Sequence, residues 1–219
     1  MHRSPVQPSD PVCDLALELC EQLDRGVFPL KRDKAPLTDH GFKDATTDPD
    51  HLVRLFSKPG TALVGIPTGH GLVVVDIDKK NGKDGSAWPG LERLPQLTRK
   101  VQTPTGGEHW YYTVPTKTDV RCSSGQLYPG IDIRGDGGYV AFGTGYRVIA
   151  DEELSPLAPD ELAMLSRPAL RLSEPVNLFE ETRAVSALRA LQKQEAWHDP
   201  MLRLTASLTR RGLSKAEQL

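Results

Sequence analysis

The sequence has few cysteines, no long apolar run and no cysteine pair suited to zinc. Its three cysteines, among 219 residues, are too few and odd in number for a disulfide framework, and no C-x-x-C pair occurs. No apolar stretch approaches the roughly 18 residues that a membrane span needs, and residues 1–10 hold no apolar signal core. We therefore expect a cytoplasmic protein with no structural zinc and no membrane partner.

Neither sign of charge dominates. The chain has 27 Lys and Arg against 29 Asp and Glu, for a net charge of -2, and 38% of its residues are hydrophobic. This composition is typical of a soluble globular protein rather than a disordered one. A near-neutral total does not exclude nucleic acid, because binding needs only a local basic surface.

Three catalytic signatures are also missing. The sequence has no G-x-x-x-x-G-K-[ST] loop, its histidines show no metal-ligand spacing, and the Ser-Ser-Gly stretch at 123–125 has no general base at a readable spacing. An ATPase motor, a histidine metal site and a serine-nucleophile enzyme therefore have no support.

Short elements joined by tight turns are expected over residues 1–170. Apolar spacing predicts a helix over 11–24, Asp48 and Pro49 supply the cap and first residue of a second helix, and residues 86–97 favour a third. Apolar, β-branched runs predict hairpins that pair 61–67 with 71–77, 99–103 with 108–114, and 130–134 with 139–142, with a last strand at 146–149. Clustered hairpins with few helices between them predict an α+β fold with mixed or antiparallel sheets and flanking helices.

The composition changes near residues 168–176. Residues 176–219 contain one proline and show helical spacing, which predicts a small all-α helical appendage. This tail has an excess of basic residues, and its last helix would be cut after one turn. We therefore expect the sequence to be a piece of a longer protein.

Two carboxylates end the most apolar strand. In GLVVVDID (71–78), Asp76 and Asp78 are two residues apart, so they face the same way and lie roughly 6–7 Å apart along the strand. Such close carboxylates repel unless a cation sits between them, and Mg²⁺ or Mn²⁺ prefers oxygen ligands. The alternative is that the strand simply ends there and both side chains are solvated.

A third carboxylate lies on another short apolar strand. Asp132 stands between two isoleucines in GIDIRGDGGYV (130–140), where an inward carboxylate needs a cationic partner. It could complete a cluster with the first pair, or it could pair with a neighbour. Arg134 shares its face and could contact phosphate or serve as its structural counter-ion.

A glycine pair opens a strand of aromatic residues. In TPTGGEHWYY (103–112), Thr105, Gly106 and Gly107 precede His109. Paired glycines let the backbone approach a ligand, and a hydroxyl with free N–H groups can cradle phosphate oxygens. His109 is either a structural histidine or a donor to a triphosphate.

These three segments, in this order, resemble the bifunctional primase-polymerase (prim-pol) family of the archaeo-eukaryotic primase superfamily, found in phage and plasmid replication proteins. The resemblance covers about residues 10–150. Its acidic pair corresponds to Asp76 and Asp78, its small-x-His motif to the stretch ending at His109, and its strand aspartate to Asp132. An upstream Lys-x-Pro stretch of the family matches Lys34 to Pro36. The sequence lacks the ligands for the zinc stem of archaeal plasmid relatives, and its 141–148 stretch lacks a Pro-Pro-Ser segment.

The resemblance implies a nucleotidyltransferase, a DNA primase and DNA polymerase that starts and extends primers on single-stranded DNA from NTPs or dNTPs. Asp76, Asp78 and Asp132 would hold two Mg²⁺ or Mn²⁺ ions. The other site residues would bind the nucleotide: Thr105, Gly106, Gly107, His109, Arg134 and Lys34. It also implies a catalytic domain at 1–170, a helical bundle at 176–219, a helicase domain further along the full protein, and a bacterial host cell.

Two rival functions remain open. Acidic clusters on strands also serve metal-dependent nucleases, and a non-catalytic DNA-binding replisome module could keep the fold without activity. Incubation with a labelled oligonucleotide and Mn²⁺ separates extension from degradation.

Overall fold

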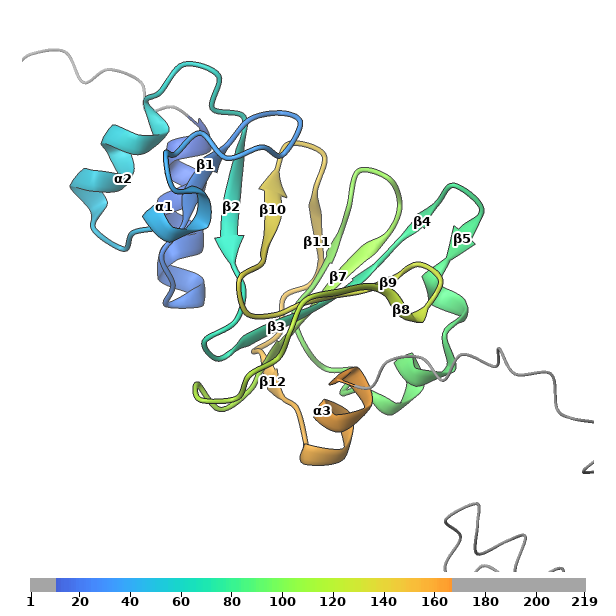
Figure 1. The fold of residues 1–219 in the computed structure, drawn as a ribbon. Helices are drawn as coiled ribbons and strands as arrows, with labels where there is room; N and C mark the ends of the chain where they lie inside the picture. The colour runs from blue at the N-terminus through green and yellow to red at the C-terminus, as the bar shows by residue number, and fades with distance from the viewer. Residues whose placement is uncertain (1–10, 167–219) are drawn as a thin grey trace, which may run out of the picture. The chain divides into compact units, whose positions relative to one another are not determined.

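The computed structural model describes residues 11–166, so the helical bundle predicted at 176–219 lies outside the described residues. The described part is a mixed α+β fold, shown in Figure 1. Its helices are α1 (Pro11–Leu23), α2 (Pro49–Phe56) and α3 (Pro159–Ser166), with short 3₁₀ helices η1 (Gly41–Asp44), η2 (Gly85–Ala87) and η3 (Pro89–Arg93). Its strands are β1 (Phe28–Leu30), β2 (Leu63–Pro67), β3 (Leu72–Ile77), β4 (Lys79–Lys80), β5 (Lys83–Asp84), β6 (Lys100–Gln102), β7 (Glu108–Thr113), β8 (Ser123–Tyr128), β9 (Ile131–Arg134), β10 (Tyr139–Gly143), β11 (Arg147–Ala150) and β12 (Ser155–Pro156).

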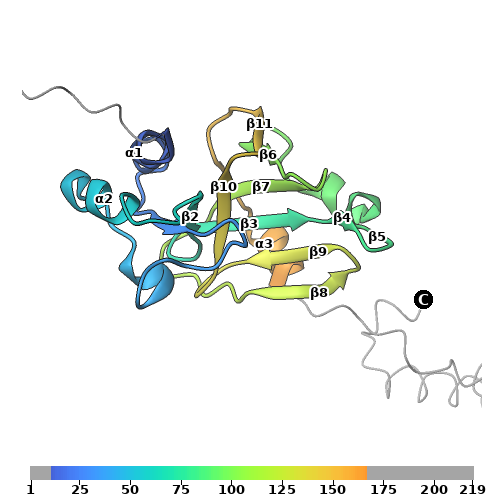
Figure 2. The ribbon, with the colours of Figure 1, turned by 90° about the horizontal axis from the view of Figure 1, so that it is seen from above.

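The strands form two main sheets and one small hairpin. A three-stranded antiparallel sheet has the order β1-β2-β10, and a seven-stranded sheet has the order β11-β6-β7-β3-β9-β8 with β12 beside β7. Figure 2 shows β3 between β7 and β9 in the larger sheet, with the β4–β5 hairpin beyond its end. Among the named strands of residues 11–166, β12 with β7 is the one parallel pair, so the prediction of mixed or antiparallel sheets is confirmed.

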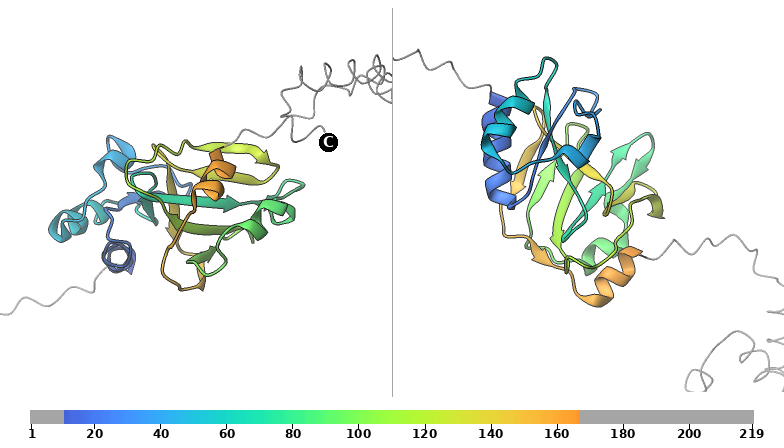
Figure 3. Two further views of the ribbon diagram at one scale, coloured as in Figure 1. Left: turned by 90° about the horizontal axis from the view of Figure 1, so that it is seen from below. Right: turned by 60° about the vertical axis from the view of Figure 1, so that its left-hand side comes forward.

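Two cores explain why β3 is apolar from Leu72 to Val75. Leu72 and Val74 face one core, which also takes side chains from the three-stranded sheet, α1 and α2. Val73 and Val75 face the other, which is closed by η3 and α3. In Figure 3, α3 lies apart from α1 and α2, as this division requires. A strand buried on both faces reads as a continuous apolar run.

Local signals placed the first two helices correctly. The apolar positions of α1 recur at helical spacing, and Ala16 and Leu19 are buried in the first core. α2 starts as predicted at Pro49, and the Asp48 carboxylate accepts a hydrogen bond of 2.7 Å from the backbone N–H of His51. Both helix predictions are confirmed.

Two of the three predicted hairpins are wrong. β2 pairs with β1 and β10, whereas β3 pairs with β7 and β9, so the segments flanking residues 68–71 lie in different sheets. β9 pairs with β3 and β8, whereas β10 pairs with β2, so the segments flanking 135–138 are also divided. The third hairpin, β6 with β7, is confirmed, and β11 adds the predicted last strand beside β6.

The chain passes between the sheets at these two turns, which lie side by side. Asp136 accepts hydrogen bonds from the backbone N–H groups of His70 (3.0 Å) and Val120 (2.9 Å). The Thr68 N–H and hydroxyl donate to the carbonyl oxygens of Gly138 and Gly135. These hydrogen bonds hold the two crossings together, so the turns at 68–71 and 135–138 connect the sheets instead of forming local hairpins.

Prolines shorten the helix predicted at 86–97. Pro89 begins η3, and Leu94, which precedes Pro95, has the extended conformation (φ -83°, ψ 151°) that a following proline favours. The segment therefore forms two 3₁₀ turns instead of one α-helix. No helix within residues 11–166 has the length and apolar character to cross a membrane.

Candidate active site

Asp132, Asp76 and His109 form a row across the centre of the larger sheet. Asp76 on β3 lies directly opposite Asp132 on β9 and directly opposite His109 on β7. Opposite residues of antiparallel strands share a face, with Cβ atoms about 4.5–5.5 Å apart. The row is therefore on the face of the sheet that also carries Val74 and Tyr111 into the first core.

Arg134 joins the two opposed carboxylates. Its Nη2 is 3.2 Å from Asp76 Oδ2 and 2.9 Å from Asp132 Oδ2. The carboxylate side chains are only 14% and 12% exposed, against 34% for the arginine. One guanidinium nitrogen thus compensates two largely buried like charges, which is the structural counter-ion role considered for Arg134 from the sequence.

Asp132 and Asp78 have further partners that compensate their negative charges. Asp132 Oδ1 accepts hydrogen bonds from the Ser124 hydroxyl (2.8 Å) and the Gly125 N–H (3.0 Å) at the start of β8. Asp78, one residue beyond β3, makes an ion pair of 2.7 Å with Lys80 Nζ, and this contact holds the pKa of Lys80 above its ordinary value. Each of the three carboxylates therefore has a partner in the protein.

His109 is buried on β7, directly opposite Asp76. Burial lowers its pKa, and the nearby Asp76 carboxylate only partly opposes this effect. Its Nε2 lies 3.5 Å from Asp76 Oδ1, whereas Nδ1 has no hydrogen-bond partner among the described residues. The hydroxyls of Tyr111 and Tyr146 also lack described partners, and their rings lie 6.3 and 5.9 Å from the imidazole. The histidine is thus bordered by hydrogen-bonding groups that protein atoms leave free in the described region.

Lys34 comes close to this histidine from the other sheet. It follows β1 in a tight turn where its own φ is +69°, and the Tyr139 hydroxyl donates to its carbonyl oxygen. Lys34 Nζ lies 5.8 Å from the ring centre of Tyr146, which in turn packs against His109. The structure therefore brings Lys34 and His109 to the same region.

The glycine turn lies against the end of β3. A Cβ on Gly107 would lie 2.3 Å from the carbonyl oxygen of Ile77, so only glycine fits there. Gly106 has a φ of +82° and open space around it, and the Thr105 hydroxyl is 3.1 Å from that of Thr103. The turn is thus held beside the strand that carries Asp76 and Asp78, with the Gly106 position open to solvent.

The carboxylates of the row are the kind of ligand that a hard divalent cation prefers. In this structure they are not arranged as a closed metal site. Within residues 11–166, no three His, Cys, Asp or Glu side chains are grouped closely enough to hold a metal ion. However, the row offers carboxylate oxygens, which Mg²⁺ and Mn²⁺ prefer. Asp76 and Asp132 already direct one oxygen each at a single positively charged atom of Arg134. A cation could take that place if the guanidinium moved away.

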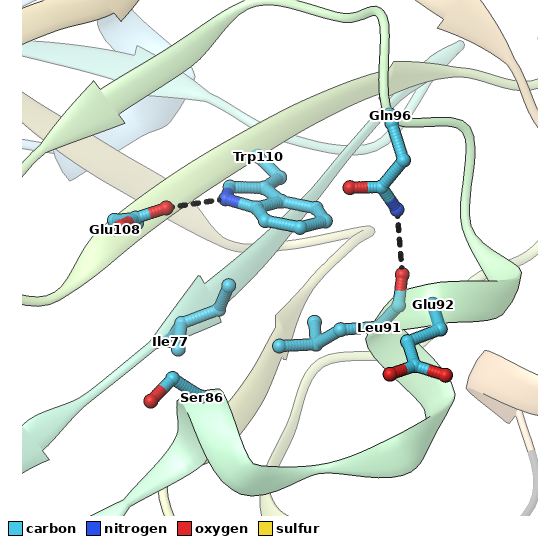
Figure 4. Close-up of a pocket in the computed structure, with 7 residues that line it drawn as sticks. All are labelled: Ile77, Ser86, Leu91, Glu92, Gln96, Glu108 and Trp110. Atoms are coloured by element: carbon cyan, nitrogen blue, oxygen red, sulfur yellow. Dashed lines mark hydrogen bonds between the residues drawn. The ribbon is translucent and has the colours of Figure 1, made fainter.

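The pocket shown in Figure 4 is on the opposite face of the sheet. Its volume is about 420 Å³, and Ile77, Glu108 and Trp110 line it from the strands that carry the acidic row. Ile77 and Trp110 belong to the second core, so the thickness of the sheet separates this hollow from Asp76. The acidic row and the pocket are therefore distinct features.

Sequence reasoning considered Arg134 as a counter-ion but missed the other partners of the carboxylates. Lys80 continues the alternation of Asp76 and Asp78 by two residues, so strand periodicity could have identified it. Ser124 and Gly125 reach Asp132 from β8, whose pairing with β9 is interrupted by a register shift. Ser124 lies directly opposite Asp132 in this strand pair, and the sequence does not predict the contact because its pattern indicates no strand at 123–128.

The comparison with protein families gives a match over most of the chain. The family model described as bifunctional DNA primase/polymerase, N-terminal, matches residues 16–163. This range covers more than half of the chain and includes the acidic row, the glycine turn, Lys34 and Arg134. No curated protein matches the chain.

Proposed function

The chain belongs to the bifunctional DNA primase/polymerase family, and we propose on this basis that it starts and extends primers on a single-stranded DNA template. The family implies a nucleotidyltransferase of the primase and polymerase type, with DNA and nucleotides as substrates. We propose NTPs or dNTPs as the nucleotide donors and phage or plasmid DNA in the cytoplasm of a bacterial host as the setting. We also propose a helicase domain in the same full-length chain.

The observation that carries the proposal is the row of Asp132, Asp76 and His109 on neighbouring strands, with Arg134 between the two carboxylates. Asp76, Asp78 and Asp132 would hold two Mg²⁺ or Mn²⁺ ions. When bound, these ions would lower the pKa of the attacking 3′-hydroxyl and neutralise charge on the α-phosphate and the pyrophosphate.

The remaining residues would bind and orient the incoming nucleotide. His109 would donate a hydrogen bond to a phosphate oxygen, and the Thr105–Gly107 backbone would lie along the triphosphate, because Gly106 leaves that surface open. Lys34 and Arg134 would add positive charge. In this proposal Arg134 exchanges a carboxylate contact for a phosphate contact, since both are oxygen acceptors that a guanidinium binds well.

A templated synthesis assay tests the proposal. The protein is incubated with unprimed single-stranded DNA and labelled NTPs or dNTPs in the presence of Mg²⁺ or Mn²⁺. We expect template-dependent products that disappear when EDTA is added, and the two nucleotide sets report the sugar preference. Degradation of the template would favour a metal-dependent nuclease. DNA binding without incorporation would favour a non-catalytic replisome module.

A further inference from the structure

A short basic hairpin continues the strand that carries the acidic row. β4 and β5 pair Lys79 with Asp84 and Lys80 with Lys83. Asn81 and Gly82 connect them with φ values of +54° and +74°, the left-handed backbone of the tight two-residue turn that favours Asn-Gly. Figures 1 and 2 show the hairpin extending beyond the end of β3. The lysines are therefore carried on a defined turn next to Asp78.

The base of the hairpin is anchored to β9. The Asp78 N–H donates to the Gly130 carbonyl at 2.7 Å, and the Gly85 N–H donates to the Asp78 carbonyl at 2.9 Å. A Cβ on Gly85 would lie 2.2 Å from the Gly130 carbonyl oxygen, so the two backbones touch. The Thr105–Gly107 turn instead packs on β3 near Ile77 and continues into β7. The hairpin and the glycine turn thus flank the end of β3 from its two sides.

The two faces of the hairpin differ in charge. Lys79 and Asp84 are opposite each other, so that face pairs unlike charges. Lys80 and Lys83 share the other face, where directly opposed like charges are destabilising. Lys80 is paired with Asp78, but Lys83 makes no ion pair with any residue that the structure describes. This face therefore holds two positively charged lysine side chains and one carboxylate, and a bound polyanion would stabilise this arrangement.

We propose that Lys80 and Lys83 form a phosphate-binding pair that contacts the backbone of the DNA strand at the active site. This inference rests on the proposed function for its choice of DNA. Lysine binds phosphate as a compact point charge without reading sequence, which suits a template of any sequence. We favour the DNA strand over the nucleotide as the ligand, because the hairpin that carries Lys80 and Lys83 lies on the β9 side. The Thr105–Gly107 turn, proposed to hold the triphosphate, lies on the other side.

The test compares single-stranded DNA binding by three variants of the whole chain across a range of salt concentrations, without nucleotide. Lys83→Gln removes one charge and leaves the Asp78–Lys80 pair intact, and the Lys80→Gln/Lys83→Gln variant removes both. Lys79→Gln, on the other face of the hairpin, is the matched control. Each phosphate contact contributes about 0.7 to the slope of log affinity against log salt for single strands. We expect the slope to fall by about 0.7 in the single variant and about 1.4 in the double variant, and to stay unchanged in the control.

Three results would overturn the inference. The first is an unchanged slope in both lysine variants, and the second is an equal decrease in the Lys79→Gln control. The third is an unchanged slope with weaker binding of dNTP measured by calorimetry, which would assign the pair to the triphosphate. Nucleotide incorporation by the unmodified protein is measured separately. Its absence would refute the proposed function, whereas the slope would still report whether the hairpin binds nucleic acid.

Discussion

Arg134 holds two like charges together at the centre of the site, and its loss should expose their repulsion. We predict that Arg134→Ala lowers the free energy of unfolding by about 1–2 kcal/mol in EDTA, because two charge-assisted hydrogen bonds are lost and the guanidinium is about one-third exposed. Added Mg²⁺ should reduce this loss, since a cation would compensate the same carboxylates. Urea unfolding with and without Mg²⁺ measures both effects.

Arg121→Ala is the matched control for this prediction. Its side chain is 89% exposed and its contact with Asp119 is 3.7 Å long, so its removal should change stability by about 0.5 kcal/mol or less. Equal losses in the two variants, or a loss at Arg134 that Mg²⁺ leaves unchanged, would contradict the role given to Arg134.

Strand periodicity predicted part of the site at the scale of single residues. Alternation alone placed Asp76 and Asp78 on one side, and the structure has Asp76 directly opposite Asp132. The contacts of Asp132 with β8 could not be predicted in the same way. Ser124 reaches Asp132 because the two residues lie opposite each other on β8 and β9, and no sequence pattern indicates the strand β8. The metal-binding roles of the three carboxylates stay predictions.

At the scale of elements, Asp136 joins the two crossings between the sheets. We predict that Asp136→Ala lowers the free energy of unfolding by about 1–3 kcal/mol, because the N–H groups of His70 and Val120 lose their acceptor. Nucleotide incorporation per folded molecule should not change, since Asp136 makes no contact with the acidic row. Thermal unfolding and a primer-extension rate measure the two quantities.

The exposed Asp119 provides the control for Asp136. Within residues 11–166, its carboxylate forms one ion pair, with the exposed Arg121. Asp119→Ala should therefore leave stability nearly unchanged. An Asp136→Ala protein as stable as the parent would show that the crossings do not depend on this side chain.

The same two crossings explain which elements could not be predicted. Apolar runs around a glycine turn predict a local hairpin, and β6 with β7 follows that rule. The turns at 68–71 and 135–138 also contain glycines, yet their flanking strands separate into different sheets. The difference comes from distant partners, β10 for β2 and β7 for β3, which no local pattern encodes. The β4–β5 hairpin was missed for another reason, because its strands are charged and too short to show alternation.

At the scale of the whole molecule, residues 16–163 carry the family match and all proposed site residues. We predict that a chain ending at Ala169 extends an annealed primer at the same rate as the full chain. Synthesis without a primer should fall, because the basic excess of the 176–219 segment would help to bind the initiating nucleotide or the template. The ratio of unprimed to primed synthesis measures this effect. An unchanged ratio would remove the segment from initiation, and loss of primed extension would place part of the catalytic machinery in it.

The most direct test of the acidic row as the catalytic centre is the rate of single-nucleotide incorporation on a primed template by Asp76→Asn. We predict a loss of at least about a thousandfold, equivalent to about 4 kcal/mol of transition-state stabilisation, in a protein whose circular dichroism matches the parent. Asp50→Asn, at an exposed position in the first turn of α2, is the matched control and should keep the parental rate. A folded Asp76→Asn protein that incorporates nucleotides as fast as the parent would contradict the assignment.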